Sequence, residues 1–381
     1  MNTRTDQPKI LVLYSETGGT HRNAAEAIQE AIEIQYPDQY DVKLVDIWSY
    51  CGWPLKNFPS VNHLFRAREI ISKSSMRYSD HVAGLRFFQW FTKPFLRRIV
   101  DRMMVENPCD LIVSVHPLVS APVIEILNGK NEIPIVVVVS DLATQNIFWF
   151  HPDVDFLILP SEQTQRTALR VGMDWKKIFL LGVPVGMKYC VKLETQAQIQ
   201  NRLGLDTDKP VILLAGGQQG VGPIRTTAEI LDHEFNGINL VIISGRNKHL
   251  QSQLQGTHWN NHVIIKGYVE EMWDWMWAAD ILISKAGTGM LAEALSVGVP
   301  MILFNRVPYL EDANVSFLVN QGAAIWAPTP KSVANALKYW LERPQEREKA
   351  EKVCRRLAKP EAARQLADVL TDIADGKIVS V

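Results

Sequence analysis

A histidine and two glycines stand where a buried strand gives way to a helix near the start of the chain. Residues 10–14 form an unbroken apolar run of strand length, and apolar residues recur at helical spacing from residue 23 onward. Gly18 and Gly19 permit a tight turn, and free N–H groups at the helix start favour an anion or a polar ligand. His21, a residue type whose unperturbed pKa lies near neutrality, lies at this turn. The stretch therefore indicates part of a functional site, although His21 could also be a polar residue that only hydrogen-bonds the turn.

Two further glycine-rich loops follow apolar runs in the second half of the chain. They are AGGQQGVG at residues 215–222 and SKAGTG at residues 284–289. The first lacks the Gly-Lys-Ser/Thr ending of a Walker A loop and the GxGxxG spacing, yet backbone N–H groups at helix starts still bind phosphate. Glu293 follows the second loop, and this pattern favours a diphosphate attached to a hydroxylated ring such as ribose. Arg246, after another strand, can supply charge to a phosphate or face solvent.

The elements that must position these loops alternate between strand and helix. Continuous Val/Ile/Leu runs separated by amphipathic segments are typical of parallel strands joined by crossover helices. We expect strands at 10–14, 110–115, 133–139, 156–160, 211–216, 239–244, 263–268, 281–287 and 300–304. A hinge within 180–205 places the boundary between two halves near residue 186. The predicted fold class is α/β, with two doubly wound Rossmann-like domains whose strand ends face each other across a cleft.

Composition and charge narrow the classes of function. The chain has 381 residues, 47% of them hydrophobic and 21% charged, and a formal net charge of -1. This balance provides no overall basic field, so we expect no nucleic-acid partner. The four cysteines are far apart, which predicts neither a disulfide framework nor a zinc site and favours a reducing compartment. We expect no signal peptide, and no apolar run reaches the roughly 18 residues of a spanning helix.

A basic and aromatic segment at residues 53–104 interrupts the alternation. It carries ten basic and three acidic residues among several Trp and Phe side chains. Basic charge beside such rings is typical of a segment in a membrane interface, where anionic lipids are the expected partner. Alternatively, the aromatic side chains pack on the first domain while the arginines face water.

Longer stretches resemble a known family. The second half is similar to the nucleotide-sugar domain of MurG-type GT-B glycosyltransferases, and to the monogalactosyldiacylglycerol synthases of the family 28 type in particular. The stretches that carry this likeness are GGQQGVGPI (216–224), ISGRNKHL (243–250), KGYVEEMWDWMWAADILISKAGTGMLAEAL (266–295) and PYLEDANVSFLVNQGAA (308–324). Those of the first half are SETGGTHRNAAEAI (15–28), SVHPL (114–118), SDLATQNIFWFH (140–151) and LPSEQTQRTALRVGM (159–173).

The resemblance implies a domain organisation and a reaction. An acceptor-binding domain would span residues 1–185, a UDP-sugar-binding domain 186–360, and a C-terminal helix or tail at 361–381 would cross back to the first domain. The implied enzyme is an inverting, metal-independent hexosyltransferase without a cofactor. It would move galactose or glucose from a UDP-sugar to a lipid hydroxyl, with diacylglycerol as the expected acceptor, on the cytoplasmic face of a membrane. Alternatives are a polyprenyl-linked acceptor, a UDP-sugar epimerase or hydrolase, or a non-catalytic nucleotide-sugar binding protein.

The resemblance also implies roles for individual residues. His21 would be the general base on the acceptor hydroxyl. The implied donor-binding residues are Gly216, Gly217, Gln218, Gly220, Arg246, Tyr268, Val269, Ala286, Gly287, Thr288, Glu293, Leu310, Glu311 and Asn314. Gly18, Gly19, His116 and Asp141 would line the acceptor side, and His116 and Asp141 could equally be structural. No metal ligands are implied, and the acidic pair at residues 153 and 155 lies away from the donor loops.

The chain departs from the plant-type pattern at several positions. Thr20 stands where the family has a third glycine before the histidine, and Asn146 where it has a histidine. The family's KAGPGT loop reads KAGTGM here, and the Gln-Glu pair offered to the sugar reads Leu310–Glu311. Since an amide that hydrogen-bonds a buried sugar hydroxyl discriminates strongly between substrates, its loss at Leu310 should alter donor choice.

Overall fold

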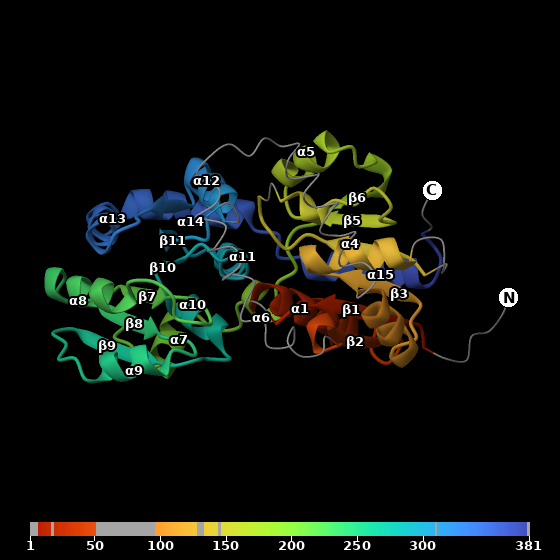
Figure 1. Ribbon diagram of the computed structural model, residues 1–381. Coiled ribbons are helices and arrows are strands. Elements are labelled where there is room, and N and C mark those ends of the chain that lie inside the picture. Colours follow the sequence, from red (N-terminus) through yellow and green to blue (C-terminus); the bar gives the residue numbers. More distant parts are fainter. Residues whose placement is uncertain are drawn as a thin grey trace, which may run out of the picture.

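The computed structural model describes residues 7–16, 19–50, 96–127, 133–143, 146–308 and 311–378. Within these residues, two parallel six-stranded sheets are each covered by helices (Figure 1). The chain completes the first sheet before it begins the second. The α/β fold class predicted from the alternation of apolar runs and amphipathic segments is confirmed.

The first sheet is a core of buried apolar strands. In spatial order its strands are β2 (Asp41–Asp46), β1 (Lys9–Tyr14), β3 (Leu111–Ser114), β4 (Ile135–Val138), β5 (Phe156–Leu159) and β6 (Ile178–Leu180). Its helical elements are α1 (Gly19–Gln35), η1 (Ile47–Tyr50), α4 (Pro117–Leu127), η3 (Ile147–Trp149), α5 (Glu162–Arg170) and η4 (Trp175–Lys177). Every residue of β3, β4 and β5 is buried, because helices cover both faces of a parallel sheet.

The second sheet repeats this plan. In spatial order its strands are β12 (Ala324–Trp326), β11 (Met301–Asn305), β10 (Ile281–Lys285), β7 (Val211–Ala215), β8 (Asn239–Ile243) and β9 (His262–Lys266). Its helices are α8 (Ile224–Glu234), α9 (Lys248–Gln255), α10 (Met272–Ala278), α11 (Thr288–Val297), α12 (Asp312–Gln321), α13 (Pro330–Glu342) and α14 (Pro344–Leu357). The short helices α6 (Met187–Cys190) and α7 (Gln196–Arg202) lie in the connection between the sheets.

The last helix, α15 (Ala362–Ala374), packs on the first sheet and not on the second. Its residues Ala363, Leu366 and Leu370 share a hydrophobic cluster with Ile28 and Ile32 of α1. Figure 1 shows α15 in blue beside the red and orange start of the chain. The two ends of the described chain therefore belong to the same half of the molecule.

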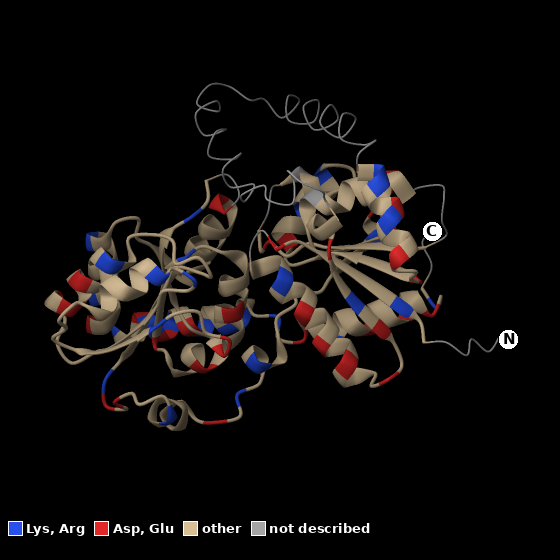
Figure 2. Ribbon diagram, turned by 60° about the horizontal axis from the view of Figure 1, so that its bottom comes forward, with Lys and Arg blue, Asp and Glu red and all other residues tan. Residues whose placement is uncertain are grey.

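The basic and aromatic segment at residues 53–104 is described only at its end. Residues 53–95 lie outside the described residues, whereas 96–106 are helical, with Val100 and Met103 buried against the first sheet. No helix in the described part of the chain has the length and apolar character needed to cross a membrane. Figure 2 shows basic and acidic residues interspersed over both halves of the molecule.

The two halves meet at the starts of α1 and α11. These helices follow the carboxyl ends of β1 and β10, where parallel sheets place their ligand sites. Their first turns are joined directly, since the Gly289 N–H donates to Thr20 Oγ1 at 3.2 Å. The glycine loops of the two halves are thereby brought to one place.

Candidate active site

His21 lies in the first turn of α1 with a fixed orientation. Its Nδ1 is 2.7 Å from the Val115 carbonyl oxygen and 3.2 Å from Ser140 Oγ. Because a carbonyl oxygen only accepts hydrogen bonds, Nδ1 carries the proton and Nε2 keeps a free lone pair. Burial lowers the pKa of His21, so the neutral ring is present at neutral pH. This tautomer is the one a general base requires.

Two aromatic side chains border the His21 ring. The ring of His116 lies edge-on at a centroid distance of 4.4 Å, and that of Trp149 lies at 6.1 Å. Burial is the main cause that holds the pKa of His116 well below its usual range. A positive charge on His21, when that ring is protonated, lowers the pKa of His116 further. His116 is therefore a neutral, buried neighbour of His21 and not a second cation.

Asp141 joins this cluster to the other half of the molecule. Its Oδ2 accepts from Trp149 Nε1 at 2.8 Å, and its Oδ1 accepts from Thr288 Oγ1 at 3.0 Å. The Asp141 charge raises the pKa of His21, against the larger lowering by burial. A carboxylate so placed stabilises the imidazolium that forms when His21 takes a proton.

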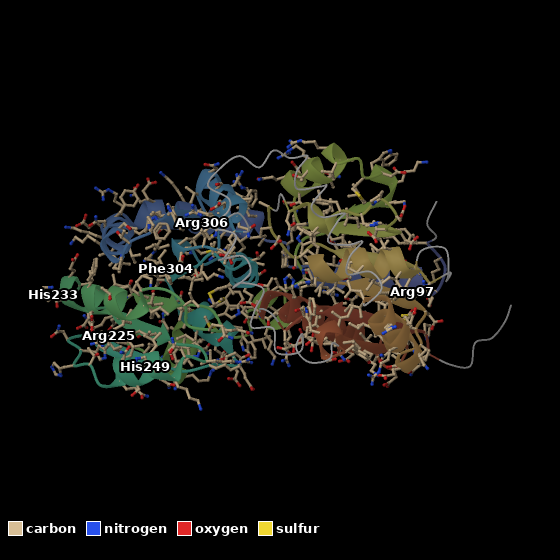
Figure 3. The ribbon with its side chains drawn as sticks, in the orientation of Figure 1. Arg97, Arg225, His233, His249, Phe304 and Arg306 are labelled. Atoms are coloured by element: carbon tan, nitrogen blue, oxygen red, sulfur yellow. The ribbon has the colours of Figure 1, made fainter. Side chains whose placement is uncertain are left out.

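The loop after β7 is folded so tightly that it requires glycine. Gly217 and Gly220 have positive φ angles of 70° and 57°. A Cβ on Gly220 would collide with the Ser244 carbonyl, and one on Gly222 with the ring of Phe304, which is labelled in Figure 3. Such backbone can approach a ligand more closely than any loop with side chains.

Arg246 and Tyr268 lie beside this loop. The Arg246 N–H donates to the Gln218 carbonyl at 2.7 Å, and the Arg246 guanidinium stacks on the Tyr268 ring at 4.9 Å from its centroid. Tyr268 is 46% exposed, so this stacked pair offers a planar, open surface. Val269, by contrast, packs against the core of the second half.

The start of α11 carries an ammonium group that the sequence analysis missed. Lys285 Nζ is 2.7 Å from Glu311 Oε1 and lies 3.9 Å from where a Cβ on Gly287 would be. Burial raises the pKa of Glu311, partly offset by the charge of Lys285. A cation at a helix start reinforces the preference of that start for an anion. The sequence did offer one indication of this role, since Lys285 stands at the end of an apolar run and directly before the glycine turn.

The other predicted residues of this loop are mostly engaged in internal contacts. The N–H of Ala286 donates to the Asn305 carbonyl and that of Gly287 to the Lys285 carbonyl. The first-turn N–H of Thr288 points out of the helix start by the geometry of any α-helix. Asn314 is buried, with Oδ1 accepting from Ala143 N and Nδ2 donating to Thr288 Oγ1, each at 3.0 Å.

Glu293 is buried where the two halves meet. Its Oε1 accepts from Asn23 Nδ2 of α1 at 2.9 Å, and its carboxylate also hydrogen-bonds the Tyr189 hydroxyl. Burial raises the pKa of Glu293 to about 7. Asn23 was not predicted, because it meets Glu293 only through the approach of the two halves. Gly18 and Leu310 lie outside the described residues.

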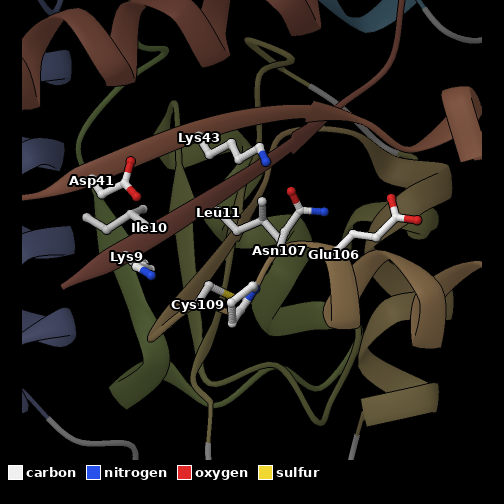
Figure 4. Close-up of a pocket in the computed structure, with 9 residues that line it drawn as sticks. Lys9, Ile10, Leu11, Asp41, Lys43, Glu106, Asn107 and Cys109 are labelled. Atoms are coloured by element: carbon white, nitrogen blue, oxygen red, sulfur yellow. The ribbon is translucent and has the colours of Figure 1, made fainter. Parts of the chain in front are cut away.

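A separate pocket of about 210 Å³ lies at the opposite end of the first sheet (Figure 4). Lys9 and Asp41, the first residues of β1 and β2, line it together with Lys43, Glu106 and Cys109. Because parallel sheets bind ligands at the carboxyl ends of their strands, this pocket is not part of the candidate site. No cluster of His, Cys, Asp and Glu in the described residues could hold a metal ion.

Comparisons with known proteins match both halves of the chain. The family model for monogalactosyldiacylglycerol (MGDG) synthase matches residues 21–185, and that for the glycosyltransferase family 28 C-terminal domain matches residues 211–366. Monogalactosyldiacylglycerol synthase 1, chloroplastic, from Arabidopsis thaliana is 32% identical over 98% of this chain and 72% of its own length.

Solved structures support the same architecture. MurG from Acinetobacter baumannii aligns with a TM-score of 0.61 at 17% identity, covering 96% of this chain and 99% of that one. A putative UDP-N-acetylglucosamine 2-epimerase from Listeria monocytogenes aligns with a TM-score of 0.65 at 13% identity, covering 99% of both chains. At such identities the likeness concerns the fold alone. The predicted GT-B arrangement is confirmed, as is the predicted family. The chain thus belongs to the monogalactosyldiacylglycerol synthase family and is a glycolipid-forming, UDP-sugar-dependent glycosyltransferase.

Proposed function

We propose that this enzyme transfers a hexose from a UDP-sugar to the free hydroxyl of diacylglycerol, with inversion at the anomeric carbon. One observation carries the proposal. His21, with Nδ1 held by the Val115 carbonyl and Nε2 available as a base, lies in the same first turn of α1 that contacts the start of α11. A base on one wall of the cleft and an anion site on the other is the arrangement that a displacement between two substrates requires.

The donor is assigned to the second half, residues 186–360. The glycine loop that contains Gly216, Gly217 and Gln218 would contact the diphosphate, and the stacked pair of Arg246 and Tyr268 would hold the uracil ring. Glu293 would bind the ribose hydroxyls, for which a carboxylate is the usual partner. Its present contacts with Asn23 and Tyr189 are of the same kind as those it would make with two hydroxyls.

We place the binding site of the leaving diphosphate at the start of α11. Lys285 and the helix start would stabilise the negative charge that develops on the diphosphate, an electrostatic role that a divalent cation fills in other enzymes. In the donor-free protein the Glu311 carboxylate neutralises Lys285 at 2.7 Å. Donor binding would let the phosphates share this ammonium, and Glu311 would then face the sugar.

The chemical step follows from these positions. The acceptor hydroxyl gives its proton to His21 Nε2 while its oxygen attacks the anomeric carbon from the face opposite the diphosphate. The bond from the anomeric carbon to the β-phosphate oxygen breaks, and UDP leaves with both electrons. Asp141 stabilises the imidazolium that results, because its charge raises the pKa of His21. Inversion is the expected outcome of a single displacement.

The acceptor is assigned to the first half, residues 1–185, and to a membrane surface. The basic and aromatic composition of residues 53–104 supports peripheral binding to anionic lipid on a cytoplasmic face. The expected site of the acceptor hydroxyl is the space beside His21, which His116 and Trp149 border.

The test is a transfer assay with the purified full-length chain. Radiolabelled UDP-galactose and UDP-glucose are supplied separately with diacylglycerol in mixed micelles. The proposal expects labelled lipid from at least one donor, and proton NMR of that lipid should show the β-anomer formed from the α-configured donor. Free hexose or an interconverted UDP-sugar, without labelled lipid, would refute lipid transfer. The donor that reacts also reports what Leu310 does to sugar choice.

A further inference from the structure

Two threonines form hydrogen bonds from one half of the molecule to the other. Thr20, in the first turn of α1, accepts from the Gly289 N–H at 3.2 Å. Thr288, the first residue of α11, donates to Asp141 Oδ1 at 3.0 Å.

Thr20 supplies a helix cap that α11 cannot supply itself. The N-cap residue of α11 is Gly287, which has no side chain and makes no capping hydrogen bond. An N-cap side chain normally accepts from the N–H of the second or third helical residue. Gly289 is the second residue of α11, so the Thr20 hydroxyl fills the capping position from the other half of the molecule.

The backbones can come this close because each helix has a glycine in its first turn. A Cβ on Gly289 would lie 3.2 Å from Thr20 Oγ1, and a Cβ on Gly19 would lie 2.6 Å from the side-chain carbon Cδ of Gln218. A larger residue at Gly19 would therefore have to displace the Gln218 side chain, which lies against the first turn of α1. The first turn of α1, including His21, is thus seated directly on the proposed donor site.

Thr288 takes part in a second set of hydrogen bonds between the two halves. Its hydroxyl accepts from Asn314 Nδ2 and donates to Asp141, whose other oxygen accepts from Trp149 Nε1. Thr288 is 4% exposed and Asn314 1%, so water does not compete for these hydrogen bonds. This series runs from the donor half to the Trp149 ring that borders His21.

We propose that Thr20 and Thr288 are positioning residues that hold the two halves of the molecule in the arrangement in which His21 can act. This inference rests on the proposed function, and it concerns the side-chain hydroxyls only. Thr20 fixes the turn that carries His21 against α11, and Thr288 fixes Asp141, which in turn holds the Trp149 ring beside His21. In this proposal the two hydroxyls act through the groups that they hold, and not on a reacting atom.

The test compares valine and serine at both positions. Valine keeps the branched shape and removes the hydroxyl, whereas serine keeps the hydroxyl. For Thr20→Val and Thr288→Val, kcat should fall roughly three- to tenfold each, the range expected for one net hydrogen bond that acts in the reactive state. Serine at either position should restore kcat to within roughly twofold of wild type. Wild-type kcat in both valine variants, or equal losses with serine and valine, would overturn the proposal.

A matched control separates positioning from general stability. Thr195 caps α7 by accepting from the Gln198 N–H, and its hydroxyl also donates to Gln198 Oε1 within the same turn. Thr195→Val should lower the melting temperature, as the loss of a helix cap does, and leave kcat unchanged. If Thr195→Val lowers kcat as much as the cleft variants do, then destabilisation accounts for the effect and the proposal fails.

Small-angle X-ray scattering of the donor-free protein tests closure without any transfer reaction. The double variant Thr20→Val/Thr288→Val should have a larger radius of gyration than wild type and than Thr195→Val. Equal radii in all three would overturn the proposal even if the enzyme is active. Absence of transfer by wild type, with the expected change in scattering, would instead refute the proposed function and still show that Thr20 and Thr288 hold the two halves together.

Discussion

The buried carboxylate of Glu293 should make the stability of this protein depend on pH. Burial raises its pKa from the ordinary value of 4.5 to about 7, while hydrogen bonds from Asn23 and Tyr189 act in the opposite direction. An acid whose pKa is higher in the folded state binds its proton more tightly there than in the unfolded chain. The folded state is therefore progressively destabilised as pH rises through the interval from 4.5 to about 7.

The substitution Glu293→Gln removes this destabilisation. The rise in pKa corresponds to a loss of about 3 kcal/mol of unfolding free energy above neutral pH, since one pKa unit is worth about 1.4 kcal/mol. Glutamine keeps the size of the side chain and is neutral at every pH. Its amide can be paired as well, because the Asn23 amide can turn to offer its oxygen and the Tyr189 hydroxyl can accept as well as donate.

The assay is thermal unfolding of the donor-free protein between pH 5 and pH 8. Wild type should match Glu293→Gln near pH 5 and melt at a clearly lower temperature at pH 8. The same variant should bind UDP more weakly, because the proposed ribose contact loses its charge. Glu229→Gln is the matched control, since Glu229 forms a solvent-exposed ion pair with Arg225 and should alter stability little at any pH. Parallel pH curves for wild type and Glu293→Gln would refute the reasoning.

Three other predictions concern the chemistry of the cleft. Asp141→Asn removes the charge that raises the pKa of His21, so the acid limb of the kcat–pH profile should move to lower pH. The value of kcat should fall at the same time. A move of the acid limb to higher pH would contradict the role assigned to Asp141. Lys285→Met should weaken UDP binding by roughly tenfold or more in calorimetry, because a charge-assisted contact to phosphate is lost, and unchanged affinity would exclude Lys285 from the donor site. Transfer should persist in excess EDTA, and a loss of rate that magnesium restores would disprove metal-independent stabilisation of the leaving group.

The fold could be predicted because its strands are buried on both faces. Fully covered strands such as β4 and β7 are continuous apolar runs in the sequence, and these were located at 133–139 and 211–216. The strands that the sequence analysis missed lie at sheet edges. β2 has only one buried residue, and β6 and β12 have three residues each, so their hydrophobic signal is weak.

The sequence indicates the candidate residues within each half, but it does not indicate which of them meet where the two halves come together. His21, Glu293 and the glycine loops are visible as residue types at strand ends, and the resemblance to the family assigns their roles. The partners Thr20, Asn23 and Lys285 were not recognised. Thr20 and Asn23 meet residues about 270 positions further along the chain, a separation at which no local pattern in the sequence reports proximity. The Lys285–Glu311 pair depends in the same way on how β10 and α12 are placed.

The central claim is that His21 removes the acceptor proton in a UDP-sugar-dependent transfer to lipid. The most direct measurement is the rate of labelled glycolipid formation by wild type and by His21→Ala, with UDP affinity determined for both. The exposed residue His233, labelled in Figure 3, provides the control His233→Ala. We predict that His21→Ala lowers kcat by about 10²- to 10⁴-fold with unchanged UDP affinity, while His233→Ala matches wild type. Transfer by His21→Ala at the wild-type rate would contradict the account.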